Sequence, residues 1–300
     1  MPLWNPSSSA NNLKCWIRGN GQRTVSGTDI IALYDESGSG NDIDQVASSP
    51  DTKPQTGRFI NDIPAWDFTP VDITNGAGLW SATDADILEA DDHDLQLTIV
   101  FKRDAVSANQ TIIAEHAFGN SLSIMGRTSD FRIPVDTSGN LDFGSTTTSA
   151  AFIHLQFDDS AETLTAFLNG DSGTSDTGVA DLRKGSTNRQ FGIGIEGNAS
   201  GSGRTRPFDG LIAELFVYHG VAAGGGAAEQ PISFEREISE GYVAHKYNIT
   251  ISTASHTYKN GPPTACHCVA KQTLSTTLLS ASVKNPADLQ QVLNVFDERR

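Results

Sequence analysis

Residues 208–263 constrain the fold most, because they hold a short amphipathic helix that closes a domain otherwise made of short strands. They read FDGLIAELFVYHG, then FEREISEGYVAHKYNI, then HTYKNGPP, which predicts a strand, a loop, a helix and a turn. Ser233 is a suitable N-cap for that helix. The positions expected to face the core recur at spacings of four, four and three: Phe234, Ile238, Tyr242 and His245. We therefore expect a short helix near residues 234–246, packed by one face on the rest of the domain.

The rest of the sequence is divided into short apolar segments of strand length. Residues 95–102 alternate apolar and polar side chains and predict a strand buried on one face. Asn169 followed by Gly170 favours the tight turn of a hairpin, because both accept positive φ. The other expected strands are residues 13–17, 111–115, 121–125, 151–157, 164–168, 191–195 and 211–218. Turn residues separate them without a βαβ rhythm, so we expect an all-β fold, an antiparallel jelly-roll β-sandwich.

Three segments carry recognisable motifs: DESGSGN at residues 35–41, NDIPAWDF at residues 61–68, and FEREISEGYVAHKYNI at residues 234–249. They resemble motifs of the concanavalin A-like, laminin G-like jelly rolls of phage and marine bacterial surface proteins. This chain has Tyr247 where the family's helix usually carries tryptophan. The resemblance covers residues 1–263 and implies two packed antiparallel sheets. Modules of this kind bind sugars or build particle surfaces more often than they catalyse.

Charge and hydropathy exclude two classes of partner. The net charge of −15 argues against nucleic acid, which is bound through clustered Lys and Arg. Apolar stretches such as LIAELFVY are far too short to span a bilayer, so no membrane insertion is expected. The polar start MPLWNPSSSANN has no pattern of a signal peptide. We expect a protein made in the host cytoplasm and released by lysis.

Three cysteines, Cys15, Cys266 and Cys268, do not form the even set typical of a disulfide framework. Cys266-His267-Cys268 is too compact for a structural zinc site, which usually has four ligands at wider spacings. Free thiols are the expected state, and a link from Cys15 to either of the others is left open. No cofactor is expected, with calcium as the exception considered next.

Two acidic loops could supply oxygen ligands to calcium. Carboxylate and amide oxygens of several loop residues are the ligands this ion prefers. One cluster is Asp91, Asp92 and Asp94, and the other is Asp35, Asn41 and Asp42. For both clusters, ordinary turn residues are the favoured interpretation.

The sequence indicates no enzyme. A glycoside hydrolase on this fold would need carboxylates aligned on one strand, and the E-x-D-x-x-E arrangement of laminarinase-like relatives is absent. No G-x-S-x-G, Walker, dinucleotide-binding or H-E-x-x-H motif occurs. Glu214 lies in the middle of an apolar strand, where capping a loop or pairing with Arg204 or Arg206 is expected.

Carbohydrate recognition combines exposed aromatic faces with amides and charged groups that bind hydroxyls. The candidates at expected loop ends are Trp80, Phe118, Tyr258, Asn120, Asn198 and Arg204. Trp4, Trp16 and Trp66 are expected in the core.

Residues 264–300 depart from the jelly-roll pattern and form a separate C-terminal extension. Asn285 as N-cap and Pro286 at the first helical position predict a helix over residues 286–298. Its apolar stripe consists of Leu289, Val292, Leu293 and Phe296. Such a short helix is marginal alone in water, so the stripe is expected to be buried, either on its own domain or in an oligomer or particle contact.

These observations favour a non-enzymatic phage virion surface protein of the head-decoration or fibre type. Its jelly roll, residues 1–263, would bind host surface glycans. Residues 264–300 would contact copies of the chain, for example in a trimer, and other virion proteins. The alternative is a calcium-dependent lectin or adhesin not tied to a virion.

Overall fold

The computed structural model describes residues 3–8, 13–46, 53–69, 77–81, 87, 94–107, 109–115, 122–135, 139–179, 190–196, 206–219 and 233–264. Among these residues, no helix is long and apolar enough to span a membrane. The chain divides into one compact unit of Asn5–Pro262 and a second of Met1–Trp4 with Pro263–Arg300. In the second unit the Trp4 amide donates to the Pro263 carbonyl at 3.1 Å. The first four residues thus group with the C-terminal extension rather than with the sandwich.

The regular secondary structure of the larger unit consists almost entirely of strands, as expected. Its elements are η1 (Pro6–Ser8), β1 (Leu13–Arg18), β2 (Arg23–Ser26), β3 (Asp29–Leu33), β4 (Gln45–Val46), β5 (Gln55–Ile60), β6 (Ile63–Asp67), β7 (Leu79–Trp80), β8 (Leu95–Arg103), β9 (Gln110–Glu115), β10 (Ser123–Gly126), β11 (Phe131–Val135), β12 (Gly139–Phe143), β13 (Ala151–Asp158), β14 (Thr163–Leu168), β15 (Thr174–Thr177), β16 (Phe191–Ile193), β17 (Gly210–His219) and α1 (Ser233–Lys246). The predicted strands are all present, with ends that differ by a few residues. The single described α-helix matches the predicted one.

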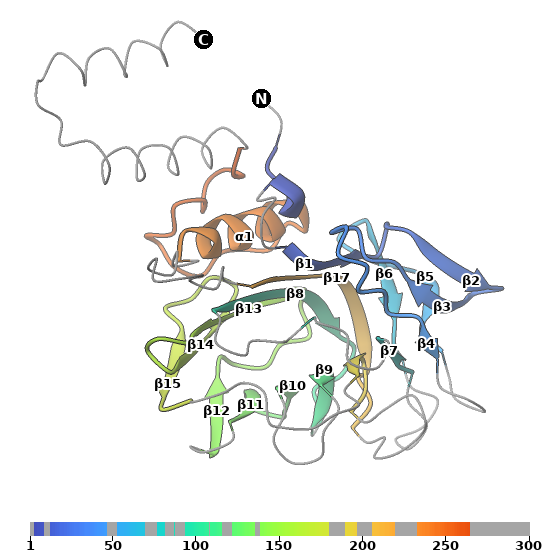
Figure 1. The fold of residues 1–300 in the computed structure, drawn as a ribbon, viewed down its shortest axis with the longest axis horizontal. Coiled ribbons are helices and arrows are strands. Elements are labelled where there is room, and N and C mark those ends of the chain that lie inside the picture. The colour runs from blue at the N-terminus through green and yellow to red at the C-terminus, as the bar shows by residue number, and fades with distance from the viewer. Residues whose placement is uncertain are drawn as a thin grey trace, which may run out of the picture. The chain divides into compact units, whose positions relative to one another are not determined.

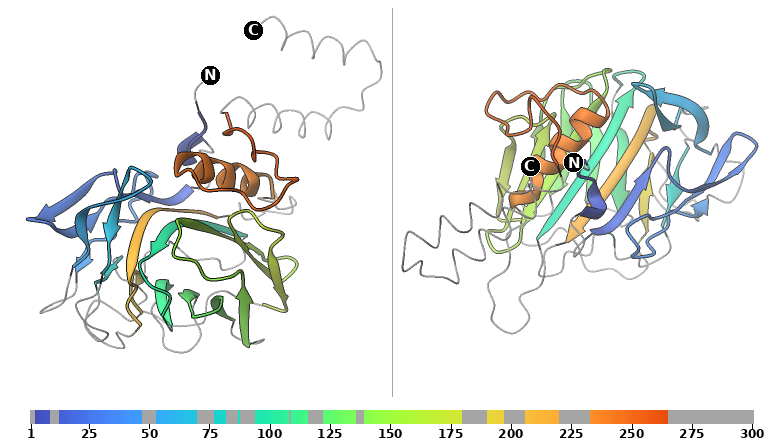
Figure 2. Two further views of the ribbon diagram at one scale, coloured as in Figure 1. Left: turned by 180° about the vertical axis from the view of Figure 1, so that it is seen from behind. Right: turned by 90° about the horizontal axis from the view of Figure 1, so that it is seen from above.

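Two antiparallel sheets form a sandwich (Figure 1). The ten-stranded sheet runs β15-β14-β13-β8-β17-β6-β5-β3-β2, with β1 also paired to β17. The seven-stranded sheet runs β12-β11-β10-β9-β16-β7-β4. Two views from opposite sides place α1 on one side of the larger sheet and β9 to β12 on the other (Figures 1 and 2).

Apolar side chains fill the space between the sheets. Phe101 on β8 meets Phe131 on β11 edge to face, with ring centroids 5.5 Å apart. Phe208 lies 6.4 Å from Phe101 and 6.4 Å from Phe68, which extends the aromatic cluster. Edge-to-face pairs of this kind add to the free energy of burying the rings. The two sheets therefore share one continuous core.

The outer face of the larger sheet is also buried at β8 and β13, because α1 packs against these two strands. We expected β8 to be half-buried, but Gln96, Thr98 and Val100 on its outer face are all at most 1% exposed. The prediction was wrong because the polar side chains of β8 indicated a face in contact with solvent, whereas α1 covers them. His154 on β13 belongs to this second buried layer, and its Nδ1 lies 2.8 Å from the Thr98 hydroxyl.

The face that α1 buries is rotated from the predicted one. Ile238 is buried as expected, but His245 is exposed, while Val243, Ala244 and Tyr247 are buried. Gly241 allows this close approach, because a Cβ at that position would lie 2.5 Å from the Cβ of Tyr258. Tyr258 is itself buried by this contact.

The DESGSGN segment closes a loop onto β1. The Asp35 carboxylate accepts hydrogen bonds from the Trp16 amide at 2.8 Å, the Ser37 amide at 2.8 Å, the Ser37 hydroxyl at 2.6 Å and the Asn41 amide at 3.0 Å. The Asn41 side chain donates to the Lys14 carbonyl at 2.7 Å. The motif is thus a self-contained turn in which the Asp35 oxygens accept hydrogen bonds from within the loop and from β1.

Candidate functional site

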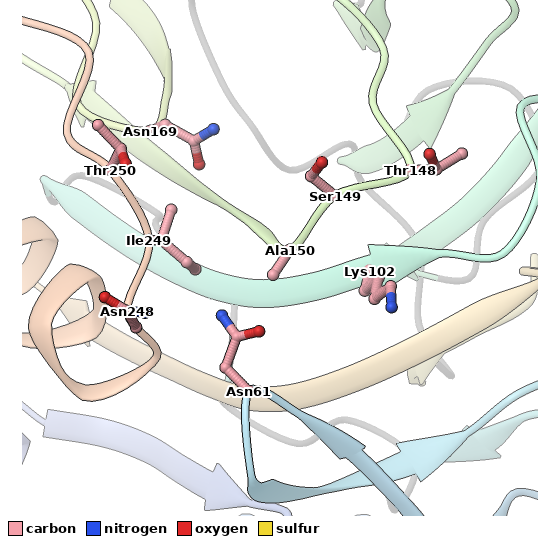
Figure 3. Close-up of a pocket in the computed structure, with 9 residues that line it drawn as sticks. All are labelled: Asn61, Lys102, Thr148, Ser149, Ala150, Asn169, Asn248, Ile249 and Thr250. Carbon is pink, nitrogen blue, oxygen red and sulfur yellow. The ribbon is translucent and has the colours of Figure 1, made fainter.

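A polar hollow with a volume of about 510 Å³ lies over the larger sheet. Its lining residues come from turns and strand ends that are far apart in the sequence: Asn61, Lys102, Thr148, Ser149, Ala150, Asn169, Asn248, Ile249 and Thr250. Figure 3 shows these side chains around the strand that carries Lys102. Among the nine, six bear an amide or a hydroxyl and one bears an ammonium group. The hollow is therefore built for hydrogen bonding rather than for apolar contact.

Asn61 reaches the hollow from the hairpin between β5 and β6. Asn61 and Asp62 form its two-residue turn with φ of 45° and 68°, and Ile60 pairs with Ile63. Two successive positive φ values are typical of the type I′ turn that matches strand twist. The Asn61 amide nitrogen donates to the Tyr247 carbonyl at 2.5 Å. That bond orients the side chain and leaves its amide oxygen available to a ligand.

Asn169 reaches the hollow from the turn after β14. The predicted turn is confirmed, with φ of 51° at Asn169 and 66° at Gly170. The Asn169 amide oxygen accepts a hydrogen bond from the Phe152 backbone amide at 2.9 Å. The fixed oxygen leaves the two N–H donors of the amide nitrogen available to a ligand.

Asn248 reaches the hollow from the end of α1. Its φ is 50°, and the Ile249 amide donates to the Ala244 carbonyl at 2.8 Å. This six-to-one bond with a left-handed residue just before it is the Schellman motif that ends many helices. The Asn248 side chain is exposed and makes no hydrogen bond within the described part of the chain.

Lys102 is the charged member of the lining. It is the next-to-last residue of β8 and is half-buried, opposite Leu211 of β17. Within the described ranges its ammonium group makes no hydrogen bond or ion pair, although its field helps to lower the pKa of Asp104. The hydroxyls of Thr148, Ser149 and Thr250 complete the polar lining.

The segment after α1 is anchored to the turn that carries Asn169. The Ser252 amide donates to the Asn169 carbonyl at 2.8 Å, and the Thr253 amide donates to the Gly170 carbonyl at 3.3 Å. Farther along, the His256 Nε2 lies 2.9 Å from the Glu240 carboxylate. Burial raises the pKa of Glu240, and the His256 and Arg236 partners oppose that shift. The two backbone hydrogen bonds therefore hold the segment that follows Asn248 against the turn that carries Asn169.

Glu214 lies in a second polar cluster, under α1 rather than in the hollow. A β-bulge between Ile212 and Glu214 turns its carboxylate toward the helix. The carboxylate accepts hydrogen bonds from the Trp16 indole at 2.7 Å, the Tyr242 hydroxyl at 3.0 Å and the Lys246 ammonium at 2.7 Å. The expected pairing with Arg206 is wrong, because Arg206 pairs with Glu196 at 3.0 Å. Burial and the Glu214 charge raise the pKa of the Tyr242 hydroxyl, in that order.

Two predicted sugar-stacking residues are not exposed. Trp80 is 1% exposed within β7, and Tyr258 is 7% exposed against Gly241. Both were expected at loop ends, but packing against the sandwich and the helix covers their ring faces. Phe118, Asn120, Asn198 and Arg204 lie outside the described residues. Trp4, Trp16 and Trp66 are buried, as expected.

Of the candidate calcium ligands Asp91, Asp92 and Asp94, only Asp94 lies within the described residues. Asp94 is buried and accepts a hydrogen bond from the Asp159 amide at 3.0 Å, so it caps a turn. Asp91 and Asp92 lie outside the described residues, as do Leu289, Val292, Leu293 and Phe296. Over the described ranges, no three His, Cys, Asp or Glu side chains are grouped to hold a metal ion. Cys15 is a buried free thiol, and burial raises its pKa well above the usual value.

Sequence reasoning missed Asn61, Lys102, Asn248 and the hydroxyl residues of the hollow. A usable signal was present at Asn248, where an asparagine follows the last helical turn. Another was present in the Asn61-Asp62 pair, which lies between apolar segments and accepts positive φ. Neither signal indicates that the two turns come together.

No family model matches this chain, and no curated protein matches it. Among solved structures, the binding domain of botulinum neurotoxin DC in complex with SialylT is 10% identical over 70% of this chain and 48% of that one, with a TM-score of 0.47. Domain 4 of AbnA, an extracellular arabinanase of Geobacillus stearothermophilus solved with arabinotriose, is 15% identical over 69% of this chain and 92% of that one, with a TM-score of 0.46. The chain spans about half the length of the toxin structures it matches. At these identities and TM-scores the likenesses do not indicate a function.

Proposed function

We propose that this chain is a non-enzymatic carbohydrate-binding protein, and that the hollow around Asn61, Asn169 and Asn248 is its binding site. The observation that carries the proposal is the convergence of these three amides, each fixed by a left-handed turn, on one cavity. A sugar hydroxyl both donates and accepts hydrogen bonds, so its site must offer both kinds of group. Here Asn61 offers an acceptor, Asn169 offers donors, and Asn248 offers both.

The size and preorganisation of the hollow support this proposal. A volume of about 510 Å³ lies within the range of small-ligand sites. Turns fix the backbone of the three asparagines, and bonds to the Phe152 amide and the Tyr247 carbonyl fix two of the side chains. Groups held in place before binding lose little conformational entropy when the ligand arrives. A polar ligand can therefore be held without large apolar contact.

We propose binding rather than catalysis because no carboxylate is among the residues that line the hollow. Glycoside hydrolysis usually needs two carboxyl groups flanking the scissile bond. None of the nine lining residues is acidic. Glu214 and Glu240 are fully buried, and each carboxylate already has a partner, Lys246 for Glu214 and His256 for Glu240.

The first test is a glycan-binding screen of the full-length protein, with and without calcium. The decisive variant is Asn248→Gly, because glycine accepts the same φ and removes only the amide. Asn109→Gly is the matched control, since Asn109 also has a positive φ of 49° but does not line the hollow. We expect Asn248→Gly to weaken binding at least about tenfold and Asn109→Gly to leave it unchanged. Equal affinities for both variants would refute the site.

The setting on a virion surface is the finer part of the proposal. It is supported by the three sequence motifs and by the apolar stripe predicted in residues 286–298. In that setting, residues 264–300 contact copies of the chain or other virion proteins, and the hollow faces host glycans. Removing residues 264–300 should then abolish assembly while leaving glycan binding intact. Unchanged assembly would refute the role of this segment but not the binding site.

A further inference from the structure

Lys102 is the one charged side chain among the nine that line the hollow. Its backbone is held by pairing with Leu211, and the following residue, Arg103, is fully buried. The Arg103 guanidinium donates to the Gln110 side chain at 2.7 Å and to the carbonyls of Arg127 and Ser107 at 2.9 and 2.8 Å. The end of β8 is therefore fixed, and the hollow receives an ammonium group on a rigid strand.

The described carboxylates nearby form their hydrogen bonds with other groups, although the Lys102 charge helps to lower the pKa of Asp104. Asp104 is held by the Arg58 guanidinium through two hydrogen bonds, at 2.5 and 2.8 Å. Asp171, which follows the Asn169 turn, accepts bonds from the amides of Leu168 and Gly173 at 3.2 and 2.9 Å. Within the described ranges the half-buried Lys102 thus makes no ion pair, in a chain with a net charge of −15.

We propose that the hollow selects saccharides that carry a carboxylate, with Lys102 as its counter-ion. This inference rests on the proposed carbohydrate-binding function and adds the class of sugar. Other donors that line the hollow suit a carboxylate, because the Asn169 amide nitrogen and the hydroxyls of Thr148 and Ser149 can donate to oxygen atoms. A hydrogen bond with an ionised partner is roughly twice as strong as a neutral one, so the charge decides between otherwise similar sugars.

The test compares an oligogalacturonate with its methyl ester, which keeps the sugar ring and removes the charge, using titration calorimetry on the full-length protein. A sulfated galactose oligosaccharide is the third ligand, which separates a carboxylate site from a general anion site. The variants are Lys102→Gln, Lys102→Arg and, as a matched control outside the hollow, Lys53→Gln. Thermal unfolding of each variant shows whether it is folded.

We expect the acid to bind at least about tenfold more tightly than the ester, and the preference to disappear in Lys102→Gln. Lys102→Arg and Lys53→Gln should keep the preference, and added salt should weaken it. Equal binding of acid and ester, abolished by Asn248→Gly, would overturn this inference and leave the proposed function standing. Tighter binding of the sulfated ligand than of the carboxylate would also overturn it. Binding of none of the saccharides on a full screen would overturn the proposed function itself.

Discussion

The Lys246 ammonium group lies 2.7 Å from the Glu214 carboxylate, which is fully buried. This ion pair joins the last turn of α1 to the bulge in β17. Tyr242 and Trp16 donate to the same carboxylate, so the helix and the larger sheet share one polar cluster. Because α1 ends at the hollow, the cluster also determines where Asn248 lies.

Replacing Lys246 with Met should destabilise the fold. The change leaves the Glu214 charge buried with only neutral donors, and breaking a buried pair in this way costs about 3 kcal/mol or more. Denaturant unfolding of the wild type and of Lys246→Met measures the difference. The control is Lys259→Met, which removes a lysine that forms no ion pair within the described ranges and should change stability by less than about 0.5 kcal/mol. Similar losses for both variants would contradict the role of the pair.

Two substitutions at Asn248 should separate stability from binding. Asn248→Gly keeps the left-handed end of α1, so its unfolding free energy should be unchanged or slightly higher. Asn248→Ala should lose about 1 kcal/mol, because a Cβ disfavours a φ of 50°. Both variants lack the amide and should bind glycans equally weakly. A stable Asn248→Ala variant would contradict the helix-end geometry, and normal binding by Asn248→Gly would contradict the site.

His154 should make the fold sensitive to mild acid. Burial, with a smaller effect of Arg236, lowers the pKa of His154 from 6.5 to about 3. Between these pH values the unfolded chain binds a proton that the folded chain does not. The unfolding free energy therefore falls as the pH falls below 6.5, by up to about 1.4 kcal/mol per pH unit from this group.

The variant His154→Asn isolates this effect. Asparagine can keep a hydrogen bond to the Thr98 hydroxyl but does not titrate in this range. Its stability at pH 7 should be lower because the side chain is smaller. Between pH 4 and 6.5, its unfolding free energy should fall less steeply with falling pH, because the contribution of one bound proton to the slope is lost. Equal slopes for the two proteins would show that His154 is not buried in its neutral form.

Replacing Asp35 with Asn should loosen the DESGSGN loop. An amide has one oxygen in place of two, so at least two of the four donors that face Asp35 lose their acceptor. We expect a loss of roughly 2 kcal/mol, measured by chemical unfolding. Addition of calcium should not raise the melting temperature through this loop, in the wild type or in the variant. A calcium-dependent increase that Asp35→Asn removes would show that the loop is a metal site instead.

The strands and the helix could be predicted because their signals are local. Turn residues and apolar alternation mark β8, β13 and β17, and the spacing of Ile238 and Tyr242 marks α1. The buried outer face of β8 could not be predicted, since Gln96 and Thr98 look like solvent-facing residues until the helix covers them.

The hollow is a tertiary feature, and this is why the sequence did not indicate it. More than a hundred residues separate Asn61 from Asn169, and nearly eighty separate Asn169 from Asn248. Each of the three is an ordinary turn residue on its own. The prediction instead favoured aromatic side chains such as Trp80 and Tyr258, whose large apolar surfaces are more strongly driven into the core. Polar turn residues remain at the surface, where they form the candidate site.

The most direct test of the central claim is a crystal structure of this protein with the saccharide that binds best in the screen. We expect the sugar in the hollow, with hydroxyls hydrogen-bonded to Asn61, Asn169 and Asn248 and an acidic group facing Lys102. A sugar bound elsewhere on the sandwich, with the hollow holding only solvent, would contradict it.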